Sequence, residues 1–349
     1  MTMTNYEIIQ KLAKKHNAEK EEFIRLLTSA DEADFELLGR LARELTLKIY
    51  GNKIFIRGLI EISSYCKNDC LYCGIRRSNK NAVRYRLDKE QILQCCNQGY
   101  KLGFRTFVMQ GGEDKFFTDD YLCDVIKEIK KRYPDCAVTL SLGERGEESF
   151  KRLYAAGADR YLLRHETADN EHYKKLHPQS MSLANRKKCL FDLKKIGYQT
   201  GAGFMVGSPY QTVQTLCEDL LFLKELNPQM CGIGPFIPHH DTPFADKSKG
   251  STRLTLMLLS IVRLLLPNVL LPATTALATA EANGHKEGVL HGANVIMPNL
   301  SPLEHRKDYS LYDNKISTGD EAAESVEHLK KSMKSIGYEV VTDRGDYKS

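Results

Sequence analysis

The stretch FIRGLIEISSYCKNDCLYCG, residues 55–74, decides the expected fold, because an apolar run ends there in a polar loop with three cysteines. Its first part, Phe55–Ser63, has the length and apolar content of a buried strand. Cys66, Cys70 and Cys73 follow in a CxxxCxxC spacing. Thiolates favour soft metals and hold iron–sulfur clusters, and three of them leave one iron of a four-iron cubane without a protein ligand. The stretch therefore predicts a strand with a metal-binding loop at its carboxyl end.

Strand-like and helical segments alternate along most of the chain. The eight expected strands are Phe55–Ser63, Thr106–Gln110, Ala137–Leu142, Arg160–Arg164, Gln199–Met205, Gln229–Gly234, Val269–Ala273 and Asn294–Met297. The amphipathic segments between them include Lys89–Gly99, Thr118–Arg132, Glu147–Ala156, Leu183–Ile196, Thr212–Leu226 and Thr252–Leu266. Repeated βα units imply a parallel sheet, and eight of them predict an α/β fold, a closed (β/α)8 barrel of TIM type. A partial barrel of six strands is the alternative, because the last two strands are the weakest.

Helices are expected before and after the barrel. Apolar residues recur at helical spacing near the N-terminus, and one helix over Phe35–Ile49 has a capped start at Asp31. A closing helix is expected over Ser317–Ile336, and a frayed tail over Arg344–Ser349. The predicted division is an N-terminal helical extension, residues 1–52, and a barrel with a C-terminal helix, residues 53–349.

The composition argues against several function classes. Lys and Arg number 50 against 45 Asp and Glu, and no dense basic block with interleaved aromatic residues is present, so nucleic-acid binding is not expected. The polar first twenty residues lack a signal-peptide pattern, and the apolar stretch Leu254–Leu271 is interrupted by Arg263 and Pro267. We therefore expect a soluble, cytoplasmic monomer without membrane contact. In that compartment the 10 cysteines argue against a disulfide framework.

Polar motifs follow the expected strands, where a barrel places its active groups. They are Gly111-Gly112-Glu113, Thr139–Glu144, Arg164-His165-Glu166, Gly203–Gly207, Gly232–Pro243, Thr274-Thr275 and Met297–Asn299. Arg186 opens the next helical segment after the fourth strand, where a guanidinium can bind a carboxylate. Each motif alone is also typical of a turn or a solvated loop, but together at one barrel mouth they predict a site.

With these motifs beside it, the CxxxCxYC loop resembles that of the radical S-adenosylmethionine (SAM) superfamily. In that superfamily the open iron binds the amino and carboxylate groups of SAM, and the reduced cluster cleaves SAM to methionine and a 5′-deoxyadenosyl radical. The segments CxxxCxYCGxRRxNK, RYLLRHET, GAGxMVGxP, GIGPFIPHxDTP, PATTA and GANVIMPN, in this order from about Ile54 to Tyr312, are similar to the [FeFe]-hydrogenase maturase HydE family.

The resemblance implies residue roles. It implies one [4Fe–4S] cluster on Cys66, Cys70 and Cys73. The SAM-binding residues that it implies are Tyr72, Gly111, Gly112, Glu113, Ser141, Glu166, Arg186 and Met205. The substrate-facing residues that it implies are Thr139, Arg164, Thr274, Thr275, Tyr309 and Tyr312. Some family members carry an accessory cluster near the C-terminus, but no cysteine follows Cys231 here, so a single cluster is expected.

The resemblance also implies a substrate and partners. The adenosyl radical is expected to attack sulfur in a small organometallic, amino-acid-like substrate, a cysteine-bound Fe(CO)2(CN) unit made by the partner maturase HydG. The product would feed assembly of the binuclear iron subcluster of the hydrogenase, with transient contacts to the other maturases.

Other functions remain open at this point. Methylornithine synthase and biotin synthase use the same barrel, although the Arg76-Arg77 pair and the FIPHHDTP segment favour the maturase. A biotin synthase would need thiolates and an arginine deep in the barrel, and Cys136 and Cys231 are too few. A non-catalytic iron–sulfur carrier, or a zinc site completed by His165 or His239, would not need the SAM-binding elements.

Overall fold

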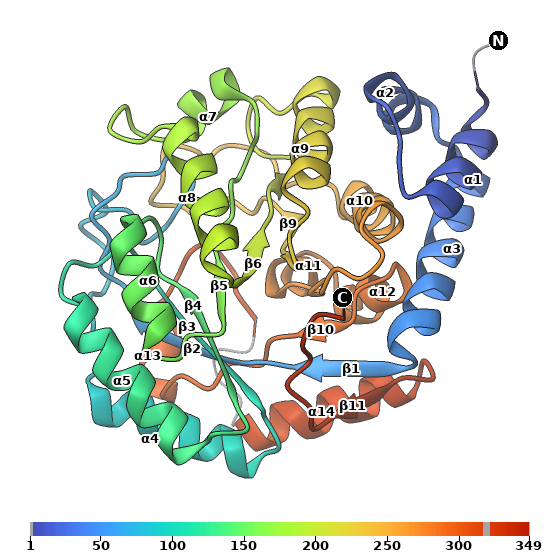
Figure 1. Cartoon of the computed structure of the whole chain (residues 1–349). Helices are drawn as coiled ribbons and strands as arrows, with labels where there is room; N and C mark the ends of the chain where they lie inside the picture. The colour runs from blue at the N-terminus through green and yellow to red at the C-terminus, as the bar shows by residue number, and fades with distance from the viewer. Residues whose placement is uncertain (1–2, 317–321, 349) are drawn as a thin grey trace.

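The strands of the protein stand around a central axis with helices outside them, as the computed structural model shows for residues 3–316 and 322–348 (Figure 1). The strands are β1 (Lys53–Ile56), β2 (Gly58–Ser63), β3 (Thr106–Gly111), β4 (Ala137–Ser141), β5 (Arg160–Leu162), β6 (Gln199–Ala202), β7 (Met205–Val206), β8 (Met230–Cys231), β9 (Gly234–Pro235), β10 (Val295–Ile296) and β11 (Glu339–Val341). The helices are α1 (Asn5–Lys15), α2 (Lys20–Ser29), α3 (Glu32–Tyr50), α4 (Lys89–Lys101), α5 (Asp119–Arg132), α6 (Glu147–Ala155), α7 (Asn170–Leu176), α8 (Leu183–Ile196), α9 (Val213–Leu226), α10 (Thr252–Leu265), α11 (Thr275–Ala280), α12 (Gly284–Leu290), α13 (Leu303–Arg306) and α14 (Ala322–Lys334).

The ring of strands is closed. β2, β3, β4, β5, β6 and β8 form one parallel sheet in that order. Single parallel bridges from Met230 to Leu270 and from Pro272 to Val295 continue it, and β10 pairs with β1. The seventh expected strand makes only these bridges, because Pro272 has no N–H to donate to a ladder. The predicted (β/α)8 barrel is confirmed, and the six-strand alternative is wrong.

Three expected strands are each split in two. The first divides at Arg57 into β1 and β2, and the fifth and sixth divide into β6 with β7 and β8 with β9. Gly203 lies at the fifth break with φ +149°, and a Cβ there would lie 2.0 Å from the carbonyl oxygen of Gly232. Only a glycine allows this approach of two backbones, so the strands change direction there and leave space at the mouth.

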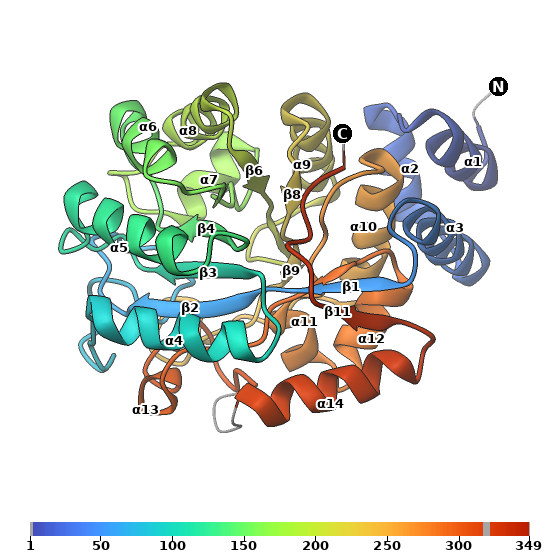
Figure 2. The ribbon, with the colours of Figure 1, turned by 60° about the horizontal axis from the view of Figure 1, so that its bottom comes forward.

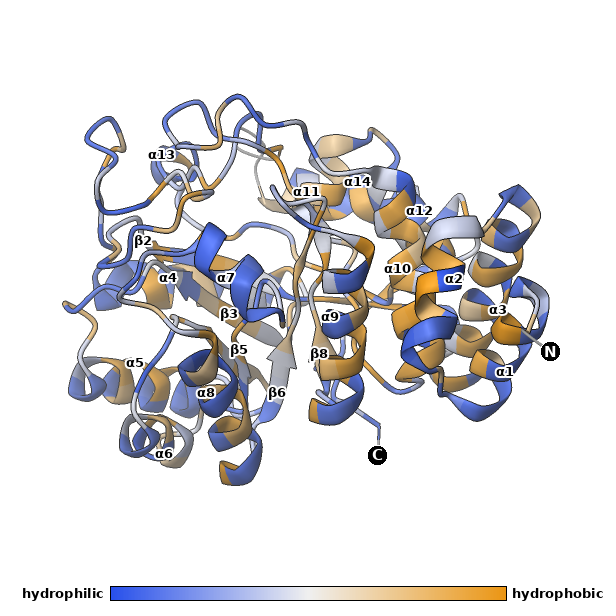
Figure 3. Ribbon diagram, turned by 90° about the horizontal axis from the view of Figure 1, so that it is seen from above, coloured by the Kyte–Doolittle hydropathy of each residue, from blue (hydrophilic) through white to orange (hydrophobic). Residues whose placement is uncertain are grey.

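The N-terminal helices pack on one side of the barrel through α10. α3 begins as predicted, with the Asp31 carboxylate accepting from the backbone N–H of Asp34 at 2.9 Å. α10 is buried from Thr255 to Leu265 and lies between the barrel and α3, so its apolar residues serve packing (Figure 3). No helix in the described part of the chain combines the length and the apolar content of a membrane span. The boundary after residue 52 stays a prediction.

The C-terminal residues close the floor of the barrel. β11 pairs with β1 in parallel, and the chain then runs across the ring (Figures 1 and 2). The buried Arg160 donates to the carbonyl of Arg344 at 2.9 Å and to the carboxylate of Asp346 at 2.6 Å. The frayed tail expected over Arg344–Ser349 is therefore wrong for residues 344–348, because a buried guanidinium needs acceptors and this segment supplies them, and Ser349 lies outside the described residues. Of the expected closing helix, residues 322–334 form α14, and 317–321 lie outside the described residues.

Candidate active site at the barrel mouth

A cavity of about 300 Å³ lies at the carboxyl ends of the strands. It collects most of the predicted site residues from separate βα units, as the barrel geometry requires. Those that line it are Cys66, Cys70, Tyr72, Cys73, Gly111, Gly112, Glu113, Ser141, Arg164, Glu166, Arg186, Thr274, Thr275, Tyr309 and Tyr312.

Two predicted residues do not line this cavity. Thr139 lies on β4 two residues before Ser141, on the same inward side but deeper, and its buried hydroxyl has no hydrogen-bond partner. Met205 is packed in an apolar cluster with Phe236 and Phe244, against which Tyr72 also packs. The predicted roles of Thr139 and Met205 stay predictions.

The cysteine loop is held in shape by two charged side chains. The Asp69 carboxylate accepts from Arg76 Nε at 2.7 Å and from the Ser78 hydroxyl at 2.7 Å. The Arg84 guanidinium donates to four backbone carbonyls, those of Ser64, Ile75, Arg76 and Asn79. Hydrogen bonds from a charged donor are stronger than neutral ones, so this clamp fixes both ends of the loop. Sequence reasoning missed Arg84.

The three thiols suit a multi-iron cluster better than a single ion. Their sulfur atoms are not all within 4.8 Å of one another, whereas the ligands of one tetrahedral zinc would lie about 3.8 Å apart. Burial raises the pKa of each thiol, that of Cys73 to about 12, which favours the protonated thiols until a metal centre binds.

Neither histidine proposed as a fourth zinc ligand is grouped with the cysteines: among the described residues, the ligand atoms that lie within 4.8 Å of one another are those of His239, His240 and Asp313. His165 Nδ1 accepts from the N–H of Gly203 at 3.3 Å, and its Nε2 lies 3.4 Å from the buried Asp219. His239 Nδ1 accepts from the N–H of Asp241, and its Nε2 hydrogen-bonds with the hydroxyl of Ser310. The zinc alternative has no support in this geometry.

The Gly-Gly-Glu element packs directly on the cysteine loop. A Cβ on Gly112 would lie 2.2 Å from the carbonyl oxygen of Tyr65, so only glycine fits. The Glu113 carboxylate accepts from the N–H of Glu144 at 3.0 Å and pairs with Lys67 Nζ at 3.0 Å. The element therefore positions a carboxylate beside the cysteine loop.

Unsatisfied polar atoms surround Glu166. This residue has φ +65°, an unusual backbone conformation for a non-glycine residue. Its Oε2 lies 3.1 Å from Arg164 Nη2, yet neither atom makes a hydrogen bond, and both are buried. Arg186 donates to Glu144 at 2.6 Å and to the carbonyl of Arg164 at 2.9 Å. Buried polar atoms that make no hydrogen bond are uncommon, so this part of the cavity suits a polar ligand.

Two further polar pairs at the cavity escaped sequence reasoning. Tyr72 hydrogen-bonds His177 Nε2 at 3.1 Å, and burial lowers the pKa of His177 to about 3, so this imidazole is neutral. Lys315 donates to the buried Glu61, which also accepts from Asn299 at 2.9 Å. Of these residues, only Glu61 could have been singled out from the sequence, because it is a carboxylate within an otherwise apolar strand.

Comparison with known proteins agrees with this site. The family model of the radical SAM superfamily matches residues 60–223. The [FeFe] hydrogenase maturase subunit HydE of Thermotoga maritima is 44% identical over 346 residues, which cover 99% of this chain and 98% of the relative. This chain belongs to the HydE family. Members of this family of radical SAM enzymes use a [4Fe–4S] cluster and SAM, and the three thiols and the unsatisfied polar atoms fit these groups.

More distant relatives of this HydE-family chain share the barrel. The 3-methylornithine synthase of Methanosarcina acetivorans is 27% identical over 90% of this chain and 88% of its own. The crystal structure of methylornithine synthase (PylB) superposes with TM-score 0.82 at 24% identity, over 96% of this chain and 97% of that one. The structure of HydG, a maturase of the [FeFe]-hydrogenase, superposes with TM-score 0.81 at 22% identity, over 96% and 75%. At these identities the structures show the fold alone.

Proposed function

We propose that this protein is an [FeFe]-hydrogenase maturase that uses a SAM-derived radical on a small cysteine-bound iron carbonyl cyanide. The observation that carries the proposal is the 44% identity to the Thermotoga maritima maturase along the whole chain. We propose further that it works in the cytoplasm as a monomer, with transient contacts to the other maturases.

Cys66, Cys70 and Cys73 would hold the cluster, and one iron would remain for SAM. When bound and reduced, the cluster supplies the electron that cleaves SAM to methionine and a 5′-deoxyadenosyl radical. Glu113 and Glu166 would accept hydrogen bonds from the SAM amino and hydroxyl groups, and Arg186 would hold its carboxylate. The other proposed SAM contacts are Tyr72, Gly111, Gly112, Ser141 and Met205.

The inner part of the cavity would orient the substrate. Arg164 offers buried donors that suit a carboxylate or a cyanide nitrogen. Burial raises the pKa of Tyr309 and Tyr312, so both phenols keep their protons and act as donors. Thr139, Thr274 and Thr275 would complete the polar ring.

The cluster and SAM assignments have direct tests. Cys70→Ser should lose the iron–sulfur absorbance and SAM cleavage, whereas Cys123→Ser, outside the loop, should keep both. Alanine at Glu166 or Arg186 should weaken SAM binding, and alanine at the exposed Glu171 should not. A Cys70→Ser protein with a full cluster contradicts the ligand set.

The maturase role is tested with the partner maturases and an apo-hydrogenase under anaerobic conditions. Hydrogen production that depends on this protein supports the proposal. SAM cleavage without any activation of the hydrogenase would remove the maturase assignment but leave the radical SAM chemistry. A protein that binds iron but never cleaves SAM would be an iron–sulfur carrier.

A further inference from the structure

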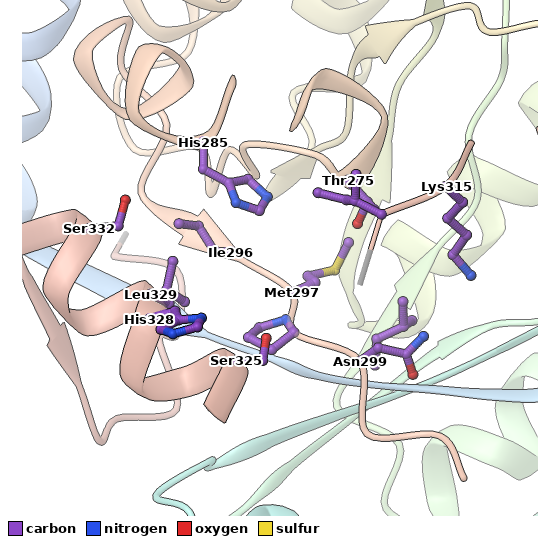
Figure 4. Close-up of a pocket in the computed structure, with 13 residues that line it drawn as sticks. Thr275, His285, Ile296, Met297, Asn299, Lys315, Ser325, His328, Leu329 and Ser332 are labelled. Atoms are coloured by element: carbon purple, nitrogen blue, oxygen red, sulfur yellow. The ribbon is translucent and has the colours of Figure 1, made fainter. Parts of the chain in front are cut away.

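A second cavity, of about 230 Å³, lies beside the active-site cavity, between β10 and α14 (Figure 4). Its walls come from the end of β10, the helices α11 and α12, and one side of α14. The lining residues Leu59, Thr275, Met297 and Lys315 also line the active-site cavity. The two cavities therefore lie on opposite sides of one shared wall.

Several polar side chains face this second cavity without partners. Within the described residues, the side chains of Thr275, His285, Ser325 and His328 make no hydrogen bond. In Figure 4 the His285 ring points from α12 into the cavity, and the His328 side chain faces the same cavity from α14. None of these four residues is fully buried, so their polar atoms are free to bond a ligand that enters the cavity.

The charge of the lining favours a ligand with acceptor oxygens. Among the described residues that line the cavity, none is Asp or Glu. Burial lowers the pKa of His285 to about 4, so its neutral ring keeps one N–H to donate. Hydroxyls and imidazole N–H groups donate to carboxylates, and the Lys315 ammonium at the inner wall is already paired with Glu61. The apolar side chains of Ile296, Met297 and Leu329 form the rest of the surface.

The position of this cavity gives it a second connection, to the surface. His328 and the neighbouring outer face of α14 are exposed to solvent, while Thr275 and Lys315 stand at the shared inner wall. This cavity, of about 230 Å³, is smaller than the active-site cavity of about 300 Å³ proposed for SAM, so we expect its ligand to be smaller than SAM.

We propose that this cavity is a second binding site, a side chamber that holds a small carboxylate of amino-acid size between the solvent and the active-site cavity. The binding site rests on the geometry alone. Its role in delivering the cysteine-based substrate, or in releasing the product, rests on the proposed maturase function.

The test uses the cluster-loaded protein with ¹³C-labelled histidine, titrated with L-cysteine and followed by NMR. Variants at His285 and His328 assign their two signals. Both signals should shift saturably with L-cysteine and should not shift with L-cysteine methyl ester, which lacks the carboxylate.

Matched variants place the ligand. Ser325→Trp fills the chamber from α14 and should weaken L-cysteine binding at least about tenfold, or 1.4 kcal/mol. His285→Phe keeps an aromatic ring but removes the N–H donor, so it should also weaken L-cysteine binding. Ser335→Trp, at an exposed position directly after the end of α14, should bind L-cysteine like the unmodified protein.

Three results would each contradict the proposed binding site. They are the absence of saturable shifts at His285 and His328, equal shifts with the methyl ester, and unchanged L-cysteine affinity in Ser325→Trp. The assay involves no turnover, so such a result would leave the maturase function standing. Conversely, failure to activate the hydrogenase would leave the binding site intact.

Discussion

Gly112 packs so closely on Cys66 that a Cβ at position 112 would lie 2.7 Å from the Cβ of the cysteine. The backbone N–H of Gly112 also donates to the carbonyl of Ser63 at 3.2 Å, which fixes the element to the end of β2. The element expected to bind the SAM amino group and the loop expected to bind the cluster are therefore one packed unit. A change in either one shifts the other.

Gly112→Ala should lower the iron content after reconstitution and weaken SAM binding together, because the added methyl group pushes the loop away at Tyr65 and Cys66. Iron analysis and a SAM titration measure the two effects. The matched control is Gly146→Ala, where a Cβ meets nothing within 4 Å. A Gly112→Ala protein with full iron and normal SAM affinity would show that the close contact has no functional role.

Arg84→Ala should make the cluster labile. The variant leaves four loop carbonyls without their charged donor, a loss of about 2 kcal/mol or more in loop order. The rate of iron loss to a chelator should rise by at least about tenfold, the factor that 1.4 kcal/mol represents. Arg77→Ala removes an exposed arginine of the same segment and should behave like the parent protein. Equal rates of iron loss in the two variants would show that the Arg84 hydrogen bonds do not hold the cysteine loop in place.

Much of the fold follows from local pattern, and its exceptions come from long-range contacts. The helix Leu183–Ile196 has the expected bounds, because periodicity and a Ser182 cap are local signals. α7 was not expected, since seven residues are too short for a periodic pattern. The break at Gly203 depends on Gly232, and the order of the C-terminal tail depends on Arg160, neither of which is near in sequence.

The site divides in the same way. Glycine and carboxylate motifs at strand ends could be read from the sequence, because the barrel brings all strand ends to one mouth. Arg84 and His177 could not, since an arginine or histidine in a loop has no pattern that says which groups it will contact. Thr139 lies one layer deeper than the cavity lining, a consequence of the two-residue strand repeat rather than of its residue type.

Asp346→Asn should destabilise the protein, because the buried Arg160 loses its charged acceptor on the barrel floor. We expect the free energy of unfolding to decrease by about 2–3 kcal/mol. This loss is smaller than that for a fully buried ion pair, because Asp346 is partly exposed. Urea unfolding measures it, with the exposed Asp246→Asn as control. A loss no larger than that of the control would show that the tail contributes little.

The Arg160–Asp346 contact also predicts that the protein loses stability at low pH. Burial alone would raise the pKa of Asp346, but Arg160 and its hydrogen bonds outweigh burial and lower the pKa to about 2. The folded-state pKa is thus below the unfolded value of 3.8, so the stabilisation is present above pH 3.8 and is lost as the pH falls toward 2. Asp346→Asn should flatten the pH dependence of stability in this window, whereas an unchanged profile would exclude Asp346 as its source.

The buried pair Glu61–Lys315 should behave as a unit. Lys315→Met leaves the Glu61 carboxylate buried without its cation and should cost about 3 kcal/mol, whereas Glu61→Gln leaves the ammonium unpaired at a similar cost. The double variant removes both charges, so its loss should be clearly smaller than the sum of the two single losses. Urea unfolding of the four proteins gives the coupling energy. Lys53→Met, at an exposed position on β1, is the control for loss of a lysine. Additive losses in the double variant would mean that the two side chains do not depend on each other, and that the wall between the two cavities is not held by this pair.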